Sequence, residues 1–110
     1  MTHLVICGHG QGKAVYDVGA VNRSLNITEA QKVRELAGVM KQHATKTHFI
    51  TDKNVYDFKD IVSISKDYES VTELHFNSFN GQAQGTEVLI KDGFKPDSLD
   101  TDLKNVLEKY

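Results

Sequence analysis

The sequence lacks features that would place it in several common protein classes. Its single cysteine, Cys7, cannot form a disulfide within the chain. Cys7 lies inside an apolar run, so we expect it to be a buried structural thiol. No run approaches the roughly 20 apolar residues that a membrane-spanning helix needs, so we expect no membrane insertion.

A surplus of positive charge is also missing. The chain has 13 Lys and Arg against 15 Asp and Glu, a net charge of −2. This balance argues against a protein whose main role is to bind nucleic acid. The N-terminus lacks the charged segment and apolar stretch of a Sec-type signal peptide, so we expect synthesis in the cytoplasm without one.

The composition that remains is that of an ordinary globular domain, with 39% hydrophobic and 25% charged residues. A chain of 110 residues can bury roughly two thirds of its surface around one core. We therefore expect residues 1–110 to form a single domain.

The first half of the chain predicts a buried strand, a long loop and a helix. Residues 3–8 form the continuous apolar run of a strand covered on both faces. Residues 9–27 are rich in Gly and Asn, and a loop of that length is usually functional. Thr28 and Gln31 form a capping box that starts a helix ending near residue 43. We expect its sheet-facing stripe to include Val33, Leu36 and Met40.

The second half continues the alternation of strands and helices. Predicted strands cover residues 45–51, 71–76 and 86–91; a weaker helix covers 57–68, and a last helix begins at Asp97 or Ser98. A polar loop over 77–85 and a turn at Asp92-Gly93 separate the later elements. The predicted fold class is therefore α/β, a three-layer sandwich with a mostly parallel or mixed sheet flanked by helices.

Three side chains in this pattern are candidate metal ligands. His9 follows the first strand, Glu29 opens the first helix, and His75 closes the strand at 71–76. If these strands are parallel neighbours, the three side chains meet at their carboxyl ends, where open α/β sheets place their sites. Two imidazoles and a carboxylate, with a fourth position left to water, are the ligands of a catalytic zinc. The first hypothesis for the function of this chain is therefore zinc-dependent hydrolysis.

Each candidate also has a simpler explanation. Glu29 could be a first-turn acid favoured by the helix dipole, and His75 a core histidine bonded to a carbonyl. However, Glu29 falls on the same helix stripe as Val33, and an acid that faces a sheet needs a reason. The remaining histidines lack comparable placement, and we interpret them as surface or structural: His3, His43 and His48.

The glycines after the first strand suggest a different function, nucleotide binding. Gly8-His9-Gly10-Gln11-Gly12-Lys13 follows a strand, but its spacing is neither that of the dinucleotide fingerprint nor that of a P-loop. Phosphate binding also needs a helix N-terminus directly after the glycines. A small nucleotide-binding α/β protein is therefore the weaker hypothesis.

The order of the motifs resembles that of the zinc-dependent N-acetylmuramoyl-L-alanine amidases of bacterial autolysins and phage endolysins. The shared motifs are, in chain order, Gly8-His9-Gly10, Asp17-Val18-Gly19-Ala20, Glu29, His75-Phe76-Asn77 and Gly85-Thr86-Glu87-Val88. Each motif is short, but their order and spacing over residues 4 to 90 are fairly specific.

The resemblance implies that His9, Glu29 and His75 bind Zn²⁺ and that Asn77 contacts substrate. The reaction implied is hydrolysis of the amide between N-acetylmuramic acid and L-alanine in peptidoglycan, at the bacterial cell wall. A bound zinc ion polarises the carbonyl and activates water, and a general base must take the proton.

The general base is the part of the resemblance that this sequence does not match. In the family this glutamate lies on a strand after the helix that is the last one here, and no residue in 91–110 matches it; Glu108 lies in that last helix. Glu87 and Glu73 are the local candidates, neither of them persuasive, so the catalytic residue stays unassigned. We therefore expect the amidase domain to be incomplete at its C-terminus.

Two further expectations follow from this mismatch. Loss of a final strand would expose a sheet edge and favour self-association. The chain could also be a non-catalytic remnant that still binds zinc or cell wall.

Overall fold

The computed structural model describes residues 3–76 and 98–107. These belong to two compact units, residues 1–78 and 79–110, which we treat separately. The predicted loop at 77–85, the strand at 86–91 and the turn at Asp92-Gly93 lie outside the described residues. The single domain over residues 1–110 therefore stays a prediction.

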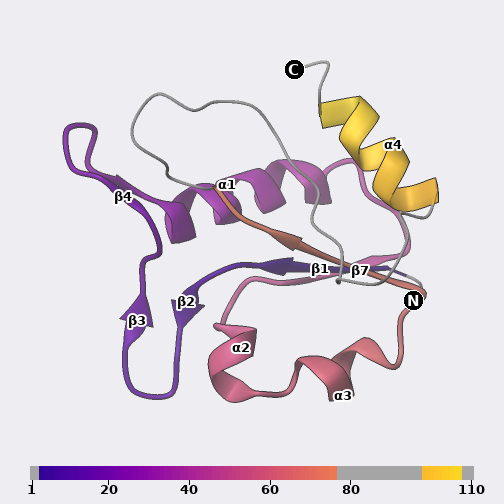
Figure 1. Cartoon of the computed structure of the whole chain (residues 1–110), viewed down its shortest axis with the longest axis horizontal. Coiled ribbons are helices and arrows are strands. Elements are labelled where there is room, and N and C mark those ends of the chain that lie inside the picture. Colours follow the sequence, from indigo (N-terminus) through magenta and orange to yellow (C-terminus); the bar gives the residue numbers. More distant parts are fainter. Residues whose placement is uncertain (1–2, 77–97, 108–110) are drawn as a thin grey trace. The chain divides into compact units, whose positions relative to one another are not determined.

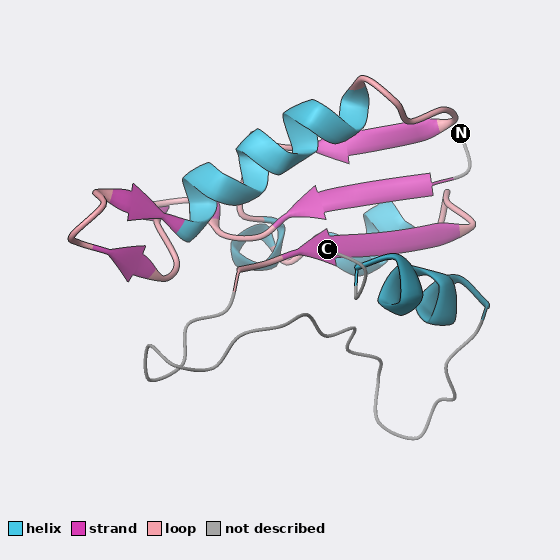
Figure 2. Cartoon of the chain, turned by 90° about the horizontal axis from the view of Figure 1, so that it is seen from above, coloured by secondary structure: helices cyan, strands magenta, loops and turns pink. Residues whose placement is uncertain are grey.

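A parallel sheet of three strands forms the centre of the first unit. The strands β1 (His3–Cys7), β6 (Thr47–Ile50) and β7 (Ser70–Leu74) lie in the order β6-β1-β7, side by side in Figure 2. The register places Cys7 opposite Leu74, so β1 and β7 end together. The three predicted strands in this part of the chain are confirmed, each somewhat shorter than expected.

The helix α1 (Glu29–Lys41) begins where the capping signal predicts. The Thr28 hydroxyl accepts a hydrogen bond from the Gln31 N–H at 3.2 Å. The N–H groups of Glu29 and Ala30 donate to the preceding loop, at the carbonyls of Ala20 and Val18. Because the first N–H groups of a helix have no partner within it, these bonds fix both the helix start and the loop that covers it.

Apolar side chains pack on both faces of the sheet. On one face Cys7 packs with Val33 and Ala37 of α1; on the other, Leu4 and Ile6 pack with Ile50 and Val55. Alternate residues of β1 thus enter different clusters, as the period of a strand requires. Cys7 is buried, as predicted.

The sheet-facing stripe of α1 differs from the prediction at Leu36, whose side chain is 38% exposed. The buried residues of the helix are Glu29, Ala30, Val33 and Ala37. The buried stripe therefore runs through Val33 and Ala37, and Leu36 lies outside it.

The single helix predicted over residues 57–68 is wrong. Two short helices are present instead, α2 (Val55–Phe58) and α3 (Ile61–Ser65). Lys59 ends α2 in the left-handed conformation, with φ of 58°, and its N–H donates to the Tyr56 carbonyl. A residue in that conformation terminates a helix, so the chain cannot continue as one.

The α/β class and the parallel sheet are confirmed. The α1 helix lies on one side of the sheet, and α2 and α3 lie on the other (Figure 1). The predicted three-layer sandwich includes the predicted strand at 86–91, which lies outside the described residues, so it stays a prediction.

Four strands of two residues each lie within residues 10–28, where the sequence predicts a loop over residues 9–27. Strand β2 (Gly10–Gln11) pairs with β3 (Tyr16–Asp17), and β4 (Val21–Asn22) pairs with β5 (Ile27–Thr28), both antiparallel. These two small hairpins extend beyond one end of the sheet (Figure 1). Strands this short have no hydrophobic period from which they could be predicted.

The second unit contributes one described helix, α4 (Ser98–Leu107), which confirms the last predicted helix. Leu103 on this helix is half-buried and Val106 is exposed. Across residues 3–76 and 98–107, no helix is long and apolar enough to cross a membrane.

Candidate metal centre

The sheet places the candidate site at a topological switch point. From β1 the chain passes through α1 to β6, then crosses through α2 and α3 to β7 on the other side of β1. The crevice beyond the carboxyl ends of β1 and β7 is where sheets of this order bind ligands. His9 and His75 each follow one of these two strands, and Glu29 opens α1 beside them.

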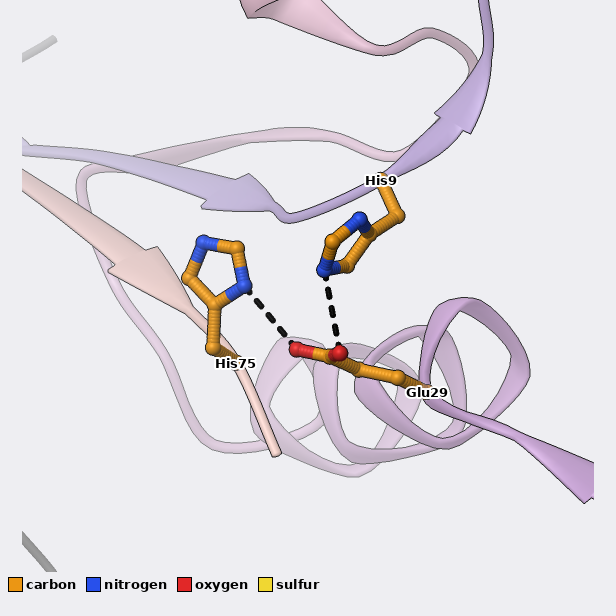
Figure 3. Close-up of side chains that lie close together, drawn as sticks. All are labelled: His9, Glu29 and His75. Carbon is orange, nitrogen blue, oxygen red and sulfur yellow. Dashed lines mark hydrogen bonds and ion pairs between the residues drawn. The ribbon is translucent and has the colours of Figure 1, made fainter. Parts of the chain in front are cut away.

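The three side chains meet as the parallel-strand hypothesis predicts (Figure 3). His9 Nε2 lies 3.0 Å from Glu29 Oε2, and His75 Nδ1 lies 2.9 Å from Glu29 Oε1. The imidazole rings are perpendicular, with centroids 5.0 Å apart. One potential ligand atom from each residue lies within 4.8 Å of the other two, so the group could hold a metal ion.

Glu29 is the buried charge at the middle of this group, with 7% of the residue exposed. Oε1 accepts from the Phe76 N–H at 2.9 Å, and Oε2 accepts from the Ala20 N–H at 3.0 Å, besides the contacts to the histidines. Burial alone would raise the pKa of Glu29, but these hydrogen bonds and the charge of His9 lower it below its ordinary value. The carboxylate is therefore ionised near neutral pH, as a metal ligand must be.

The outer nitrogen of each histidine faces a second carboxylate. His9 Nδ1 lies 2.8 Å from Asp17 Oδ2, and His75 Nε2 lies 3.2 Å from Glu73 Oε1. A metal-binding histidine usually bonds such a partner through its other nitrogen, which fixes the ring and makes it more basic. The geometry thus assigns Nε2 of His9 and Nδ1 of His75 to the metal side.

The carboxylates around His9 favour its charged form in the absence of metal. Burial lowers the pKa of His9, but the hydrogen bond with Asp17 and the charges of Glu29 and Asp17 outweigh burial, so the pKa is raised. The same hydrogen bond from His9, with that from the Gly19 N–H, lowers the pKa of Asp17. A cation in this group would replace the positive charge that His9 otherwise supplies.

Two glycines give the rings the space they occupy. A Cβ at Gly8 would lie 2.4 Å from Cε1 of His75, and a Cβ at Gly19 would lie 2.6 Å from Cδ2 of His9. Gly19 also has φ of 69°, a conformation that favours glycine. Gly8 and Gly19 therefore allow the histidine rings to pack closely against the backbone, in addition to any role in turns.

The donor set fits a metal ion of intermediate softness. Two imidazole nitrogens and one carboxylate oxygen suit zinc among the common divalent ions. The buried, ionised Glu29 and the two outer carboxylates are the features of this structure that support the fit.

The other residues singled out in the sequence lie either away from the candidate metal ligands or outside the described residues. His3, His43 and His48 lie outside the group; His3 contacts Ser70 Oγ, and His48 contacts the Tyr68 hydroxyl. Asn77, Glu87 and Glu108 lie outside the described residues.

The sequence did not predict the contacts that three residues make near the site. Asp17 lies in a shared motif without a predicted function, Glu73 is predicted only as a candidate base, and Arg34 lies in no predicted motif. A carboxylate two residues before His75 on the same strand was the available signal for Glu73, since alternate strand residues share a face.

A cavity of about 480 Å³ adjoins the group at Asp17. Its walls are the β2–β3 hairpin and the start of α2, with Val15, Tyr16, Asn54 and Asp57 among the lining residues. The Asn54 side-chain amide donates to Asp17 at 3.4 Å. Asp17 is therefore shared between the cavity wall and the His9 contact.

The glycine segment continues from Gly10 into β2, and α1 begins only at Glu29. This is not the strand–glycine–helix order that phosphate binding needs, so the nucleotide hypothesis gains no support. Comparison with protein-family models, curated proteins and solved structures found no match to this chain. The function must therefore be argued from the site itself.

Proposed function

We propose that this chain is a zinc-dependent hydrolase domain of the N-acetylmuramoyl-L-alanine amidase type. The observation that carries the proposal is the His9–Glu29–His75 group, gathered from three separate elements at the carboxyl edge of a parallel sheet. The order of motifs along the sequence supports the choice of substrate. The proposed complete fold is a three-layer sandwich.

The residues of the chain have distinct proposed roles. His9, Glu29 and His75 would hold zinc, while Asp17 and Glu73 keep the two rings in position. A bound zinc ion would supply a Lewis acid for the amide carbonyl and a water molecule of lowered pKa. The cavity beside Asp17 has a volume typical of sites that hold a small ligand, so we assign it to part of the substrate.

Neither of the two outer carboxylates, Asp17 and Glu73, is the proposed general base. Asp17 and Glu73 face the histidine nitrogens that point away from Glu29, so neither is placed to take a proton from the attacking water. Glu87 keeps that role as a proposal, and Asn77 that of a substrate contact.

The proposed partner is peptidoglycan, and the proposed place of action is the bacterial cell wall after synthesis in the cytoplasm. Self-association through a sheet edge is a separate proposal, which sedimentation velocity over a range of protein concentrations would test. A monomer at every concentration would exclude it.

Digestion of purified cell walls tests the enzymatic proposal. Zinc-loaded protein should release peptides with a free N-terminal L-alanine, detected by mass spectrometry, and a chelator should stop their release. The variant His75→Ala should lose both zinc and activity. Bound zinc without any product would contradict the amidase proposal.

A second candidate function is zinc or cell-wall binding without turnover. The outward placement of Asp17 and Glu73 favours it, because neither carboxylate supplies the base. Loss of general acid–base help typically costs about 10²–10⁴-fold in rate. Stoichiometric zinc with co-sedimentation on cell walls and no released alanine would identify this function.

A further inference from the structure

We propose that Arg34 is a positioning residue of the metal centre, which holds the backbone of His9 in the conformation that presents its ring to Glu29. The inference rests on the proposed function, because it takes His9 to be a metal ligand. Arg34 itself binds no metal and belongs to none of the motifs shared with the amidases.

The Arg34 guanidinium joins three elements at the carboxyl edge of the sheet. Its Nη1 donates to the Gly8 carbonyl at 3.0 Å, its Nη2 to the His9 carbonyl at 2.9 Å, and its Nε to the Thr51 carbonyl at 2.8 Å. Nη1 also donates to the Ala30 carbonyl of its own helix at 2.9 Å. The turn after β1 is thereby tied to α1 and to the end of β6.

The segment that Arg34 holds has a conformation that needs support. His9 has φ of 60°, which is uncommon for a residue with a side chain, and Gly10 follows with φ of 105°. Strained backbone of this kind persists where surrounding contacts determine it. The carbonyls on both sides of the His9 Cα are bound by one rigid guanidinium, so Arg34 is that contact.

Both the planar shape of the Arg34 guanidinium and its charge contribute to holding these carbonyls. One guanidinium reaches carbonyls in three directions at fixed angles, which a lysine ammonium on a flexible chain cannot reproduce. The packing is also close: a Cβ at Gly10 would lie 2.1 Å from Nη2 of Arg34. Arg34 therefore lies between the segments that follow β1 and β6, while the His9 ring faces the β1–β7 crevice.

The test compares Arg34→Met and Arg34→Lys with Lys32→Met, which removes a positive charge from the same helix. Lys32 pairs with Glu35 on the surface and serves as the matched control. Zinc affinity is measured by competition with a chromophoric chelator, the ligand geometry by the visible spectrum of the Co²⁺-loaded protein, and folding by circular dichroism of the metal-free chain.

We expect zinc affinity to fall about 10–100-fold in Arg34→Met, the range found when a supporting residue around a metal ligand is lost. Arg34→Lys should fall between Arg34→Met and wild type. The Co²⁺ spectrum should change in both, while Lys32→Met stays within about twofold of wild type and keeps its spectrum. A purely structural role would lower the melting temperature without altering the Co²⁺ spectrum of the folded protein.

Folded Arg34 variants with the zinc affinity and Co²⁺ spectrum of Lys32→Met would overturn the inference. Failure of both variants to fold would also overturn it, because Arg34 would then support the fold as a whole. If the wild-type chain binds no zinc, the proposed function and this inference fail together. If wild type binds zinc and only the Arg34 result is negative, the proposed function stands.

Discussion

At the scale of single residues, the metal centre consists of three candidate ligands and the groups that orient them. Glu29 is buried yet ionised because two backbone N–H groups and two imidazoles contact its oxygens. The other nitrogen of each ring contacts a second carboxylate, that of Asp17 for His9 and that of Glu73 for His75. Ligand orientation is therefore a property of several side chains, and each can be altered separately.

Removal of one outer carboxylate charge should weaken zinc binding without abolishing it. We expect Asp17→Asn and Glu73→Gln each to lower zinc affinity about 10–100-fold, since such partners keep a ligating imidazole oriented and basic. Competition with a chromophoric chelator measures the effect. The controls Asp67→Asn and Glu69→Gln make the same changes at exposed positions. Equal affinities in test and control variants would remove the orienting role.

The metal-free chain should lose stability as pH rises through the pKa of His9. That pKa is raised in the folded state, so the folded protein holds a proton more tightly than the unfolded chain. The resulting stabilisation is complete below the unfolded value of about 6.5 and is lost above the folded value. Urea denaturation with chelator should give a higher free energy of unfolding near pH 6 than near pH 8.

Zinc should reverse this dependence, because it binds neutral imidazole and competes with the proton. His9→Asn is the matched variant, since asparagine tolerates the positive φ of this position. It should remove both the pH dependence that comes from His9 and its reversal by zinc. An unchanged profile in His9→Asn would show that another group titrates.

At the scale of elements, the start of α1 links local sequence to the site. Thr28 caps the helix, and the carboxylate that contacts both histidines is the next residue. The capping signal was legible in the sequence, because Thr and Gln at this spacing satisfy a helix terminus by themselves. The hairpins that cover the same helix terminus could not be predicted, because their pairing depends on contacts made only after folding.

Loss of this cap should affect stability and the metal site together. Thr28→Ala should reduce the free energy of unfolding by about 0.5–2 kcal/mol, the usual cost of removing an N-cap hydroxyl. Urea denaturation measures the loss, and Thr28→Ser, which keeps the hydroxyl, is the control. We also expect weaker zinc binding in Thr28→Ala, because a frayed first turn displaces Glu29. Identical stability of the two variants would contradict the role of the cap.

At the scale of the whole molecule, the ligands join segments far apart in the sequence. Glu29 and His75 are separated by 46 positions, and His9 and Glu29 by 20. A metal ion bound only by the folded arrangement stabilises it by mass action. Zinc should therefore act as a link among β1, α1 and β7.

Zinc at about 100 times its dissociation constant should add about 2.7 kcal/mol to the free energy of unfolding. For a chain of this size, the melting temperature should rise by on the order of 10 °C. Differential scanning calorimetry measures the shift, a chelator should reverse it, and His75→Ala should show none. A wild-type melting temperature that does not respond to zinc would contradict the metal centre.

Features that depend on neighbouring residues can be predicted from the sequence alone. The apolar run of β1, the cap and length of α1 and the positions of His9, Glu29 and His75 at element ends all follow from local periodicity and capping. The parallel arrangement followed from the alternation of elements. From these, the meeting of the three side chains could be predicted.

The contacts that support the site arise in the tertiary structure and could not be predicted from the sequence. The break between α2 and α3, the two hairpins and the exposure of Leu36 depend on which surfaces meet. The outer carboxylates and the Arg34 contacts depend on side-chain directions across several elements. The physical reason is that such contacts arise between residues distant in the chain, where no local period carries a signal.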